Sequence, residues 1–181
     1  TERIARLASQ AAGYPLNDTG VARTFEKVLA GLGVDSKGLV IKDASGLSKE
    51  NRVTAHQVAQ LLLKIKSDSR FAPLIGGLPV GGISGTLRNR FVDTAPQAVG
   101  LVKAKTGTLN GTANLAGYVE AGDREYIFVI IADRLSKSNR AEKFARATVD
   151  RILGKIAAPL LPVFPTQPAG EVTTEAVLTT S

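Results

Sequence analysis

The amino-acid sequence predicts an α+β fold in which an antiparallel sheet is flanked by helices. Three segments rich in β-branched and aromatic residues follow one another between residues 100 and 132, and residues typical of hairpin turns separate them. Segments with the apolar spacing of helices precede and follow this region. With 181 residues, 44% of them hydrophobic, the chain is long enough to bury one core.

The first predicted helix begins at the first residue and ends near Gly13-Tyr14-Pro15, because glycine favours a helix end and proline cannot continue one. Its apolar face consists of Ile4, Leu7, Ala8 and Ala11. Because the helical pattern is already under way at Thr1, we expect the chain to be the C-terminal portion of a domain that is incomplete at its N-terminus.

Two more helices are expected before the sheet. One covers residues 20–30 and has an apolar stripe of Val21, Phe25, Val28, Leu29 and Leu32. The next begins after Thr54, which has the capping-box spacing to Gln57, and its buried face consists of Val58, Leu61, Leu62 and Ile65.

The segments between the helices predict a short strand and two loops. Leu39-Val40-Ile41 is apolar and β-branched, which is typical of a strand, and residues 43–48 form a turn-rich loop after it. Residues 73–90 contain many glycines and are expected to form a long irregular loop, which ends in a short helix start at Ser84-Gly85-Thr86-Leu87.

The predicted sheet consists of residues 100–108, 113–120 and 125–132 as an antiparallel meander. Residues 126–131 are apolar on both faces, so they are expected to form the buried central strand. A final helix over residues 139–156 should pack on this sheet. Its predicted capping box is Asn139 with Glu142, and its apolar face consists of Phe144, Ala145, Val149, Ile152, Leu153 and Ile156.

The chain is therefore expected to consist of one folded part over residues 1–157 and a disordered Pro/Thr-rich tail over residues 158–181. The tail contains neither Lys nor Arg.

Composition narrows the classes of function. The formal net charge is +7, but the basic residues are scattered singly among only 5% aromatics, which favours a solvated surface over a nucleic-acid site. The absence of cysteine excludes disulfides, thiolate metal sites and cysteine nucleophiles. No apolar run is long enough to span a membrane, and no carboxylate pair or His cluster indicates a metal or another cofactor.

The segment with the clearest chemistry is Lys105-Thr106-Gly107-Thr108, on the first predicted strand of the meander. The Lys105 ammonium and the hydroxyls of Thr106 and Thr108 suit a carboxylate, and Gly107 lets a peptide backbone lie close to the strand. Exposed N–H groups on such a strand can receive an oxyanion. The order Lys-Thr-Gly excludes a phosphate-binding loop, whereas a solvated β-segment is the alternative for the tripeptide alone.

Two further segments accompany this motif in a fixed order: Asp43-Ala44-Ser45-Gly46-Leu47-Ser48 with Asn51-Arg52, and Leu78-Pro79-Val80 through Gly85-Thr86-Leu87 with Arg90-Phe91. Asn114-Leu115-Ala116-Gly117-Tyr118 then follows Lys-Thr-Gly. From about Thr1 to Ile156 the chain resembles the D-alanyl-D-alanine carboxypeptidase/endopeptidase group of low-molecular-mass penicillin-binding proteins (class C, peptidase S13 type). The resemblance implies a β-lactamase/transpeptidase-like fold.

By this resemblance, Lys105 is a catalytic residue, and Thr106, Gly107 and Thr108 bind the carboxylate of a peptidoglycan stem peptide that ends in D-Ala-D-Ala. The strand also supplies one oxyanion N–H. β-Lactams are the implied inhibitors and the implied location is extracytoplasmic, in the periplasm or cell wall. The family's Ser-x-x-Lys and Ser-x-Asn motifs are absent from these residues. The nucleophile is therefore expected on an upstream segment, and the chain alone is expected to be inactive.

One alternative from another functional class stays open at this point: a non-catalytic module that binds peptidoglycan peptides or β-lactams. Thr24-Phe25-Glu26-Lys27 has the motif spacing with threonine, but it lies in an amphipathic helix and is expected to be structural. His56, the only histidine, is expected at the surface in a first helical turn, and Asp43, Ser45 and Ser48 are expected to fix a turn.

Overall fold

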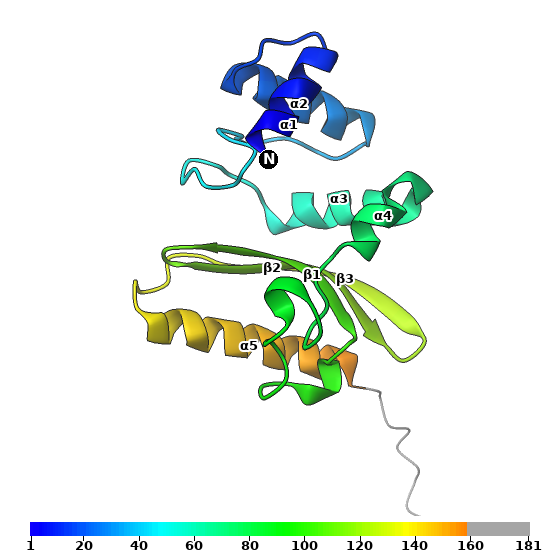
Figure 1. Ribbon diagram of the computed structural model, residues 1–181, viewed down its shortest axis with the longest axis vertical. Coiled ribbons are helices and arrows are strands. Elements are labelled where there is room, and N and C mark those ends of the chain that lie inside the picture. The colour runs from blue at the N-terminus through cyan, green and yellow to red at the C-terminus, as the bar shows by residue number, and fades with distance from the viewer. Residues whose placement is uncertain (159–181) are drawn as a thin grey trace, which may run out of the picture.

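The computed structural model describes residues 1–158, which form a three-stranded sheet with helices on both faces and a helical pair beyond them (Figure 1). The α-helices are α1 (Glu2–Ala11), α2 (Asp18–Gly31), α3 (Ala55–Ser67), α4 (Ala72–Gly76) and α5 (Asn139–Ala157). Short 3₁₀ turns are η1 (Ser69–Phe71), η2 (Gly85–Leu87) and η3 (Pro96–Ala98). The strands are β1 (Val102–Leu109), β2 (Thr112–Ala121) and β3 (Arg124–Ala132). The predicted α+β class is confirmed, whereas the predicted tail lies outside the described residues apart from residue 158.

The sheet is the predicted antiparallel meander, with strand order β1-β2-β3. The prediction that residues 126–131 form the buried central strand is wrong in both respects. β2 lies between the other two strands, and at the edge position of β3 Tyr126 and Ile131 are exposed, while only Phe128 is buried. β3 is apolar on both faces for another reason. Phe128 and Ile130 face the core on the α5 side, while α3 packs on the opposite face of β3. In Figure 1, α3 and α5 lie on opposite sides of the sheet.

The main core lies between the sheet and α5. It includes Val102 and Ala104 of β1, Leu115 and Val119 of β2, and Leu153 of α5, all of them buried. Each fully buried Val or Leu side chain stabilises the fold by about 1.5–3 kcal/mol relative to an exposed one. Because Ala104 is only one residue from Lys105, the core fixes the position of the predicted site strand.

α5 differs from its prediction in detail. Its N-cap is Ser138, whose side chain accepts a hydrogen bond from the Ala141 N–H, so Asn139 and Glu142 do not form a capping box. Val149 and Leu153 are buried as predicted, but Phe144 is 68% exposed. Ile152 and Ile156 are partly exposed as well, so only part of the predicted apolar face packs on the sheet.

The N-terminal helices form a layer of their own above α3 (Figure 1). α1 ends two residues before Gly13, as predicted, but Ile4 and Leu7 of its apolar face are exposed. The capping box of Thr54 and Gln57 is confirmed. The predicted strand at residues 39–41 is a single bridge between Val40 and Arg52, because the adjacent loop turns away at Asp43 instead of continuing the pairing.

Within the predicted loop over residues 73–90, the 3₁₀ turn η2 confirms the short helical segment predicted at residues 84–87, whereas the helix α4 was not predicted. Between them, Pro79 and Gly81 pair with β1: the Ala104 N–H donates to the Pro79 carbonyl at 3.0 Å, and the Gly81 N–H donates to the Val102 carbonyl at 2.8 Å. The sequence did not predict that residues 79–81 pair with β1 and so cover part of its outer edge.

Candidate functional site

The candidate site is the part of the β1 edge that no other strand covers. One edge of β1 pairs with β2 along its whole length, from Val102 opposite Val119 to Leu109 opposite Thr112. On the other edge, residues 79–81 pair with β1 only as far as Ala104. Among the described residues, no backbone partner continues this pairing along Thr106–Thr108, so the edge opens where the Lys-Thr-Gly motif begins.

The backbone groups of Thr106 and Thr108 point away from β2. The Leu109 N–H donates to Thr112 Oγ1 at 3.0 Å, and the Leu101 carbonyl accepts from the Glu120 N–H at 2.9 Å, so odd-numbered residues of β1 face β2. Because backbone direction alternates along an antiparallel strand, the even-numbered residues face the open edge. Their N–H and carbonyl groups can pair with an extended peptide, and an N–H there can receive an oxyanion.

Lys105 is exposed, on the sheet face opposite α5. α3 packs mainly on β3 on that face and leaves β1 accessible. Lys105 Nζ donates to the Thr106 carbonyl at 2.5 Å, so the ammonium lies against the open edge. Within residues 1–158 no carboxylate lies within salt-bridge distance of Lys105. Its positive charge is therefore available to an anionic ligand.

Lys103, on the same strand face, has a different environment. Its Nζ lies 2.9 Å from Glu120 Oε1, and this hydrogen bond raises the pKa of Lys103 above its ordinary value. The charge of Lys103 is thus compensated by a neighbour. The two lysines resemble each other in sequence, but only Lys105 presents an uncompensated charge beside the open edge.

Gly107 lies opposite Asn114 in the register of β1 and β2. A Cβ atom at residue 107 would lie 3.4 Å from the Asn114 Cβ, which is an ordinary contact. Gly107 is therefore not required by close packing inside the sheet. Because Gly107 has no side chain, nothing projects from residue 107 on the accessible face of β1 beside Lys105. This leaves room for a ligand to approach the strand, as the sequence motif predicts.

Thr106 and Thr108 project toward the α5 side, where they line a small cavity together with Arg90, Arg146 and Val149. Thr106 Oγ1 donates to Thr86 Oγ1 at 3.1 Å. Each arginine has a carboxylate partner, Asp150 for Arg90 and Glu142 for Arg146. Sequence reasoning missed Thr86 and the Arg90–Asp150 pair as neighbours of the motif, because residues 20 to 60 positions apart give no periodic signal.

The turn after Asp43 is organised by that carboxylate, as the sequence predicts. Asp43 accepts hydrogen bonds from Ser45 Oγ at 2.7 Å, Asn51 Nδ2 at 2.6 Å and the Ser48 N–H at 3.0 Å. These bonds, led by the one from Asn51, lower the pKa of Asp43 to about 2. The expectation that Asp43, Ser45 and Ser48 fix a turn is confirmed.

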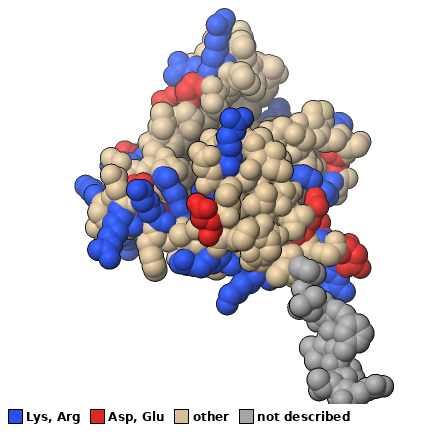
Figure 2. Space-filling view, turned by 60° about the horizontal axis from the view of Figure 1, so that its bottom comes forward, with Lys and Arg blue, Asp and Glu red and all other residues tan. Residues whose placement is uncertain are grey.

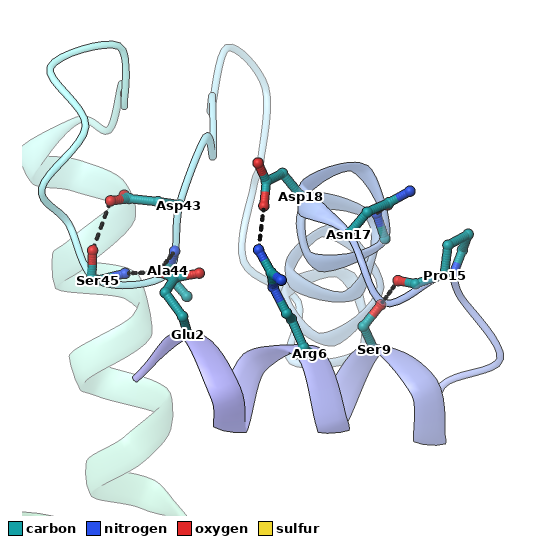
Figure 3. A network of polar contacts seen from close by, with 10 residues as sticks. Glu2, Arg6, Ser9, Pro15, Asn17, Asp18, Asp43, Ala44 and Ser45 are labelled. Carbon is teal, nitrogen blue, oxygen red and sulfur yellow. Dashed lines mark hydrogen bonds and ion pairs between the residues drawn. The ribbon is translucent and has the colours of Figure 1, made fainter.

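Glu2 of α1 holds the next part of the same turn. Its Oε1 accepts from the Ala44 N–H at 2.7 Å and from the Ser45 N–H at 2.6 Å (Figure 3). Within α1 and the loop after it, Ser9 Oγ donates to the Pro15 carbonyl at 2.8 Å (Figure 3). Polar contacts therefore connect α1 to the loop before α3.

The other two candidates of the sequence, Thr24 and His56, lie in helices as predicted. Thr24 is buried, and its Oγ1 donates to the Gly20 carbonyl at 2.8 Å, so it stabilises α2. His56 is exposed in the first turn of α3. Basic side chains are spread over several parts of the face shown in Figure 2, with acidic side chains between some of them.

In the described part of the chain, no helix combines the length and apolar character needed to cross a membrane.

Comparison with known proteins finds similar carboxypeptidases. The chain is 36% identical over 158 residues to a carboxypeptidase DacB of Mycolicibacterium smegmatis, covering 84% of this chain and 34% of that protein. It is 41% identical over 133 residues to a D-alanyl-D-alanine carboxypeptidase of Actinomadura sp., covering 71% of this chain and 24% of that protein. The chain thus spans about a third or less of these relatives.

A solved structure of penicillin-binding protein 4 from Haemophilus influenzae, in complex with a β-lactam, superposes with a TM-score of 0.73 and 26% identity. The superposition covers 83% of this chain and 36% of that one. The predicted β-lactamase/transpeptidase-like fold is therefore confirmed. A family model for the D-Ala-D-Ala carboxypeptidase 3 (S13) family matches residues 2–156. The chain belongs to the D-Ala-D-Ala carboxypeptidase 3 (S13) family.

Proposed function

We propose that this chain is the C-terminal part of the catalytic domain of a serine-type D-Ala-D-Ala carboxypeptidase/endopeptidase that acts on peptidoglycan stem peptides. Family membership supports the reaction class. The observation that carries the proposal is the open edge of β1, where the outward backbone of Thr106 and Thr108 lies beside the uncompensated charge of Lys105.

The substrate is an extended, anionic peptide. Its backbone pairs with the open edge of β1 as an added strand, and Gly107 allows it to approach closely. The hydroxyls of Thr106 and Thr108 donate to the terminal carboxylate of D-Ala, and the Lys105 ammonium supplies the opposite charge. A β-lactam carries a carboxylate beside its reactive amide, so it occupies the same groups as an inhibitor.

The reaction proceeds through an acyl-enzyme. A serine hydroxyl on a segment outside these residues attacks the carbonyl carbon of the penultimate D-Ala, and its proton passes to the leaving nitrogen as the C–N bond breaks. The terminal D-Ala departs, and water then hydrolyses the serine ester. The Thr108 N–H donates to the oxyanion that forms in each step, while Lys105 stabilises negative charge beside the transferring proton.

This reaction takes place on cell-wall material, so the protein acts outside the cytoplasm, in the periplasm or in the cell wall. No metal or organic cofactor takes part in the proposed steps. The charge stabilisation comes from Lys105, from threonine hydroxyls and from backbone N–H groups of β1.

The test is to incubate the full-length protein with a fluorescent penicillin and, separately, with a peptide that ends in D-Ala-D-Ala. We expect a covalent adduct that survives denaturation, and release of free D-Ala from the peptide. Replacing the adduct-bearing serine by alanine should abolish both signals. Reversible penicillin binding without an adduct would instead support a non-catalytic binding module and contradict the proposed enzyme.

A further inference from the structure

Thr86 is a hydroxyl residue from another segment that contacts the motif at the open edge. It lies in η2, is exposed, and its Oγ1 is 3.1 Å from Thr106 Oγ1. The sequence places these residues 20 positions apart, and only the fold brings them together. In the described part of the chain, no other side chain is hydrogen-bonded to the Thr106 or Thr108 hydroxyl.

The backbone around Thr86 is held firmly. The Gly82 N–H donates to the Leu87 carbonyl at 2.9 Å, and the Val80 N–H donates to Ser84 Oγ at 3.0 Å. Leu87 itself is fully buried in the core. Because Val80 also forms a bridge to Lys103 of β1, η2 is fixed relative to the strand that carries Thr106.

The chemistry of a hydroxyl pair gives this contact a role. A threonine hydroxyl has one proton to donate and two lone pairs to accept with. When an anion binds Thr106, the Thr106 proton must point to the anion. The Thr86 hydroxyl can then rotate, so that it no longer accepts from Thr106 Oγ1 but donates to it. The two consecutive hydrogen bonds, from Thr86 to Thr106 and from Thr106 to the anion, polarise the Thr106 hydroxyl and strengthen its bond to the anion.

We infer that Thr86 is a positioning residue for the Thr106 hydroxyl, which it holds toward the carboxylate of the bound peptide or β-lactam. This inference rests on the proposed function. Thr86 acts through Thr106 and need not touch the ligand. The inference predicts that the effect of Thr86 depends on the presence of the Thr106 hydroxyl.

The experiment measures the second-order rate of acylation by benzylpenicillin in the full-length protein. The variants are Thr86→Val, which removes the hydroxyl at constant shape, Thr86→Ser, which retains it, and Asn89→Ala as a control. Asn89 is exposed in the residues just after η2, and its side chain forms no hydrogen bond within residues 1–158. Thr106→Val and the double variant with Thr86→Val complete a double-mutant cycle.

We expect Thr86→Val to lower the acylation rate about fivefold, the effect of one lost hydrogen bond, and Thr86→Ser to restore the rate to within about twofold of the unmodified protein. In the Thr106→Val background, Thr86→Val should have no further effect. Asn89→Ala should acylate normally.

Equal losses from Thr86→Val in both backgrounds, failure of serine to restore the rate, or no loss at all would each overturn the inference. In all three cases the unmodified protein is still acylated, so the proposed function stands. Lack of acylation in the unmodified protein would refute the proposed function itself. Thermal unfolding of each variant separates a lost hydroxyl from a misfolded segment.

Discussion

Asp150 of α5 forms a nearly buried, bidentate ion pair with Arg90. Arg90 Nε lies 3.0 Å from both carboxylate oxygens, and the side chains of Asp150 and Arg90 are only 3% and 17% exposed. Asp150 also accepts from Thr94 Oγ1 at 2.9 Å. Phe91, which follows Arg90 in the chain, is buried and has a φ of 73°, a conformation that a bulky residue rarely adopts. The pair therefore fixes the segment before β1 to the helix behind the sheet.

The first prediction concerns this ion pair. Asp150→Asn should lower the free energy of unfolding of the full-length protein by about 3–5 kcal/mol, because it leaves Arg90 nearly buried without a counter-charge. Denaturant unfolding measures the loss. The control is Glu142→Gln, which breaks the more exposed Glu142–Arg146 pair within α5 and should cost about 0.5 kcal/mol or less. Similar effects of the two variants would contradict the assigned role of Asp150.

The second prediction concerns pH. The pKa of Asp43 is lowered from 3.8 to about 2 in the folded protein, chiefly by the hydrogen bond from Asn51. A lowered folded pKa stabilises the fold above the unfolded value, and this contribution is lost as the pH falls from about 4 to about 2. The amide NMR signals of Gly46, Leu47 and Ser48 should shift within this range. In Asp43→Asn the shift should be absent, and its persistence would assign the titration to another group.

Much of the fold could be predicted from local signals. The hairpin residues between the strands predicted the meander, and the spacing of Thr54 and Gln57 predicted a real capping box. These features depend on neighbours in the chain. The error about β3 has a definite cause. An apolar run indicates apolar contacts on both faces of a strand, but α3 and the core on the α5 side provide such contacts at an edge strand too, where Tyr126 and Ile131 stay exposed.

The candidate site could be predicted only in part. The motif predicted the side chains of the candidate site, and the predicted strand that holds them is confirmed. The open edge depends on where Pro79 and Gly81 stop pairing with β1, and this is a long-range property. The same holds for the Thr86 hydroxyl and for the Arg90–Asp150 pair, whose partners no periodic pattern connects.

The third prediction concerns the contact between β1 and β2. A Cβ atom at Gly117 would overlap the Lys103 carbonyl oxygen and would lie 2.7 Å from the Ala104 Cα. Since both neighbours are backbone, Gly117→Ala should force the strands apart, with a loss of stability of about 1–3 kcal/mol and slower acylation. Gly31→Ala at the end of α2 is the matched control, because nothing lies within 4 Å of its added methyl group. It should leave both measurements unchanged or raise stability slightly.

The fourth prediction concerns the 181-residue chain by itself. It contains no Ser-x-x-Lys motif, so it should form no penicillin adduct and release no D-Ala even where circular dichroism shows that it folds. Ile4, Leu7 and Phe144 are each more than half exposed, so the chain should also associate at high concentration. Analytical ultracentrifugation tests the association. A covalent adduct on the isolated chain would reveal a nucleophile within these residues.

The last prediction compares the two lysines of β1 in the full-length protein. Lys105→Ala should lower the rate of acylation by penicillin about 100-fold or more, because it removes the charge beside the carboxylate and the transferring proton. Lys103→Ala removes a charge from the same strand face, but one that Glu120 compensates at 2.9 Å. It should therefore change acylation by no more than about threefold, a loss of about 0.6 kcal/mol typical of an exposed pair. Stopped-flow labelling with a fluorescent penicillin measures both rates. If the two variants lost activity equally, general electrostatic attraction would explain the effect, and the specific role of Lys105 at the open edge would be wrong.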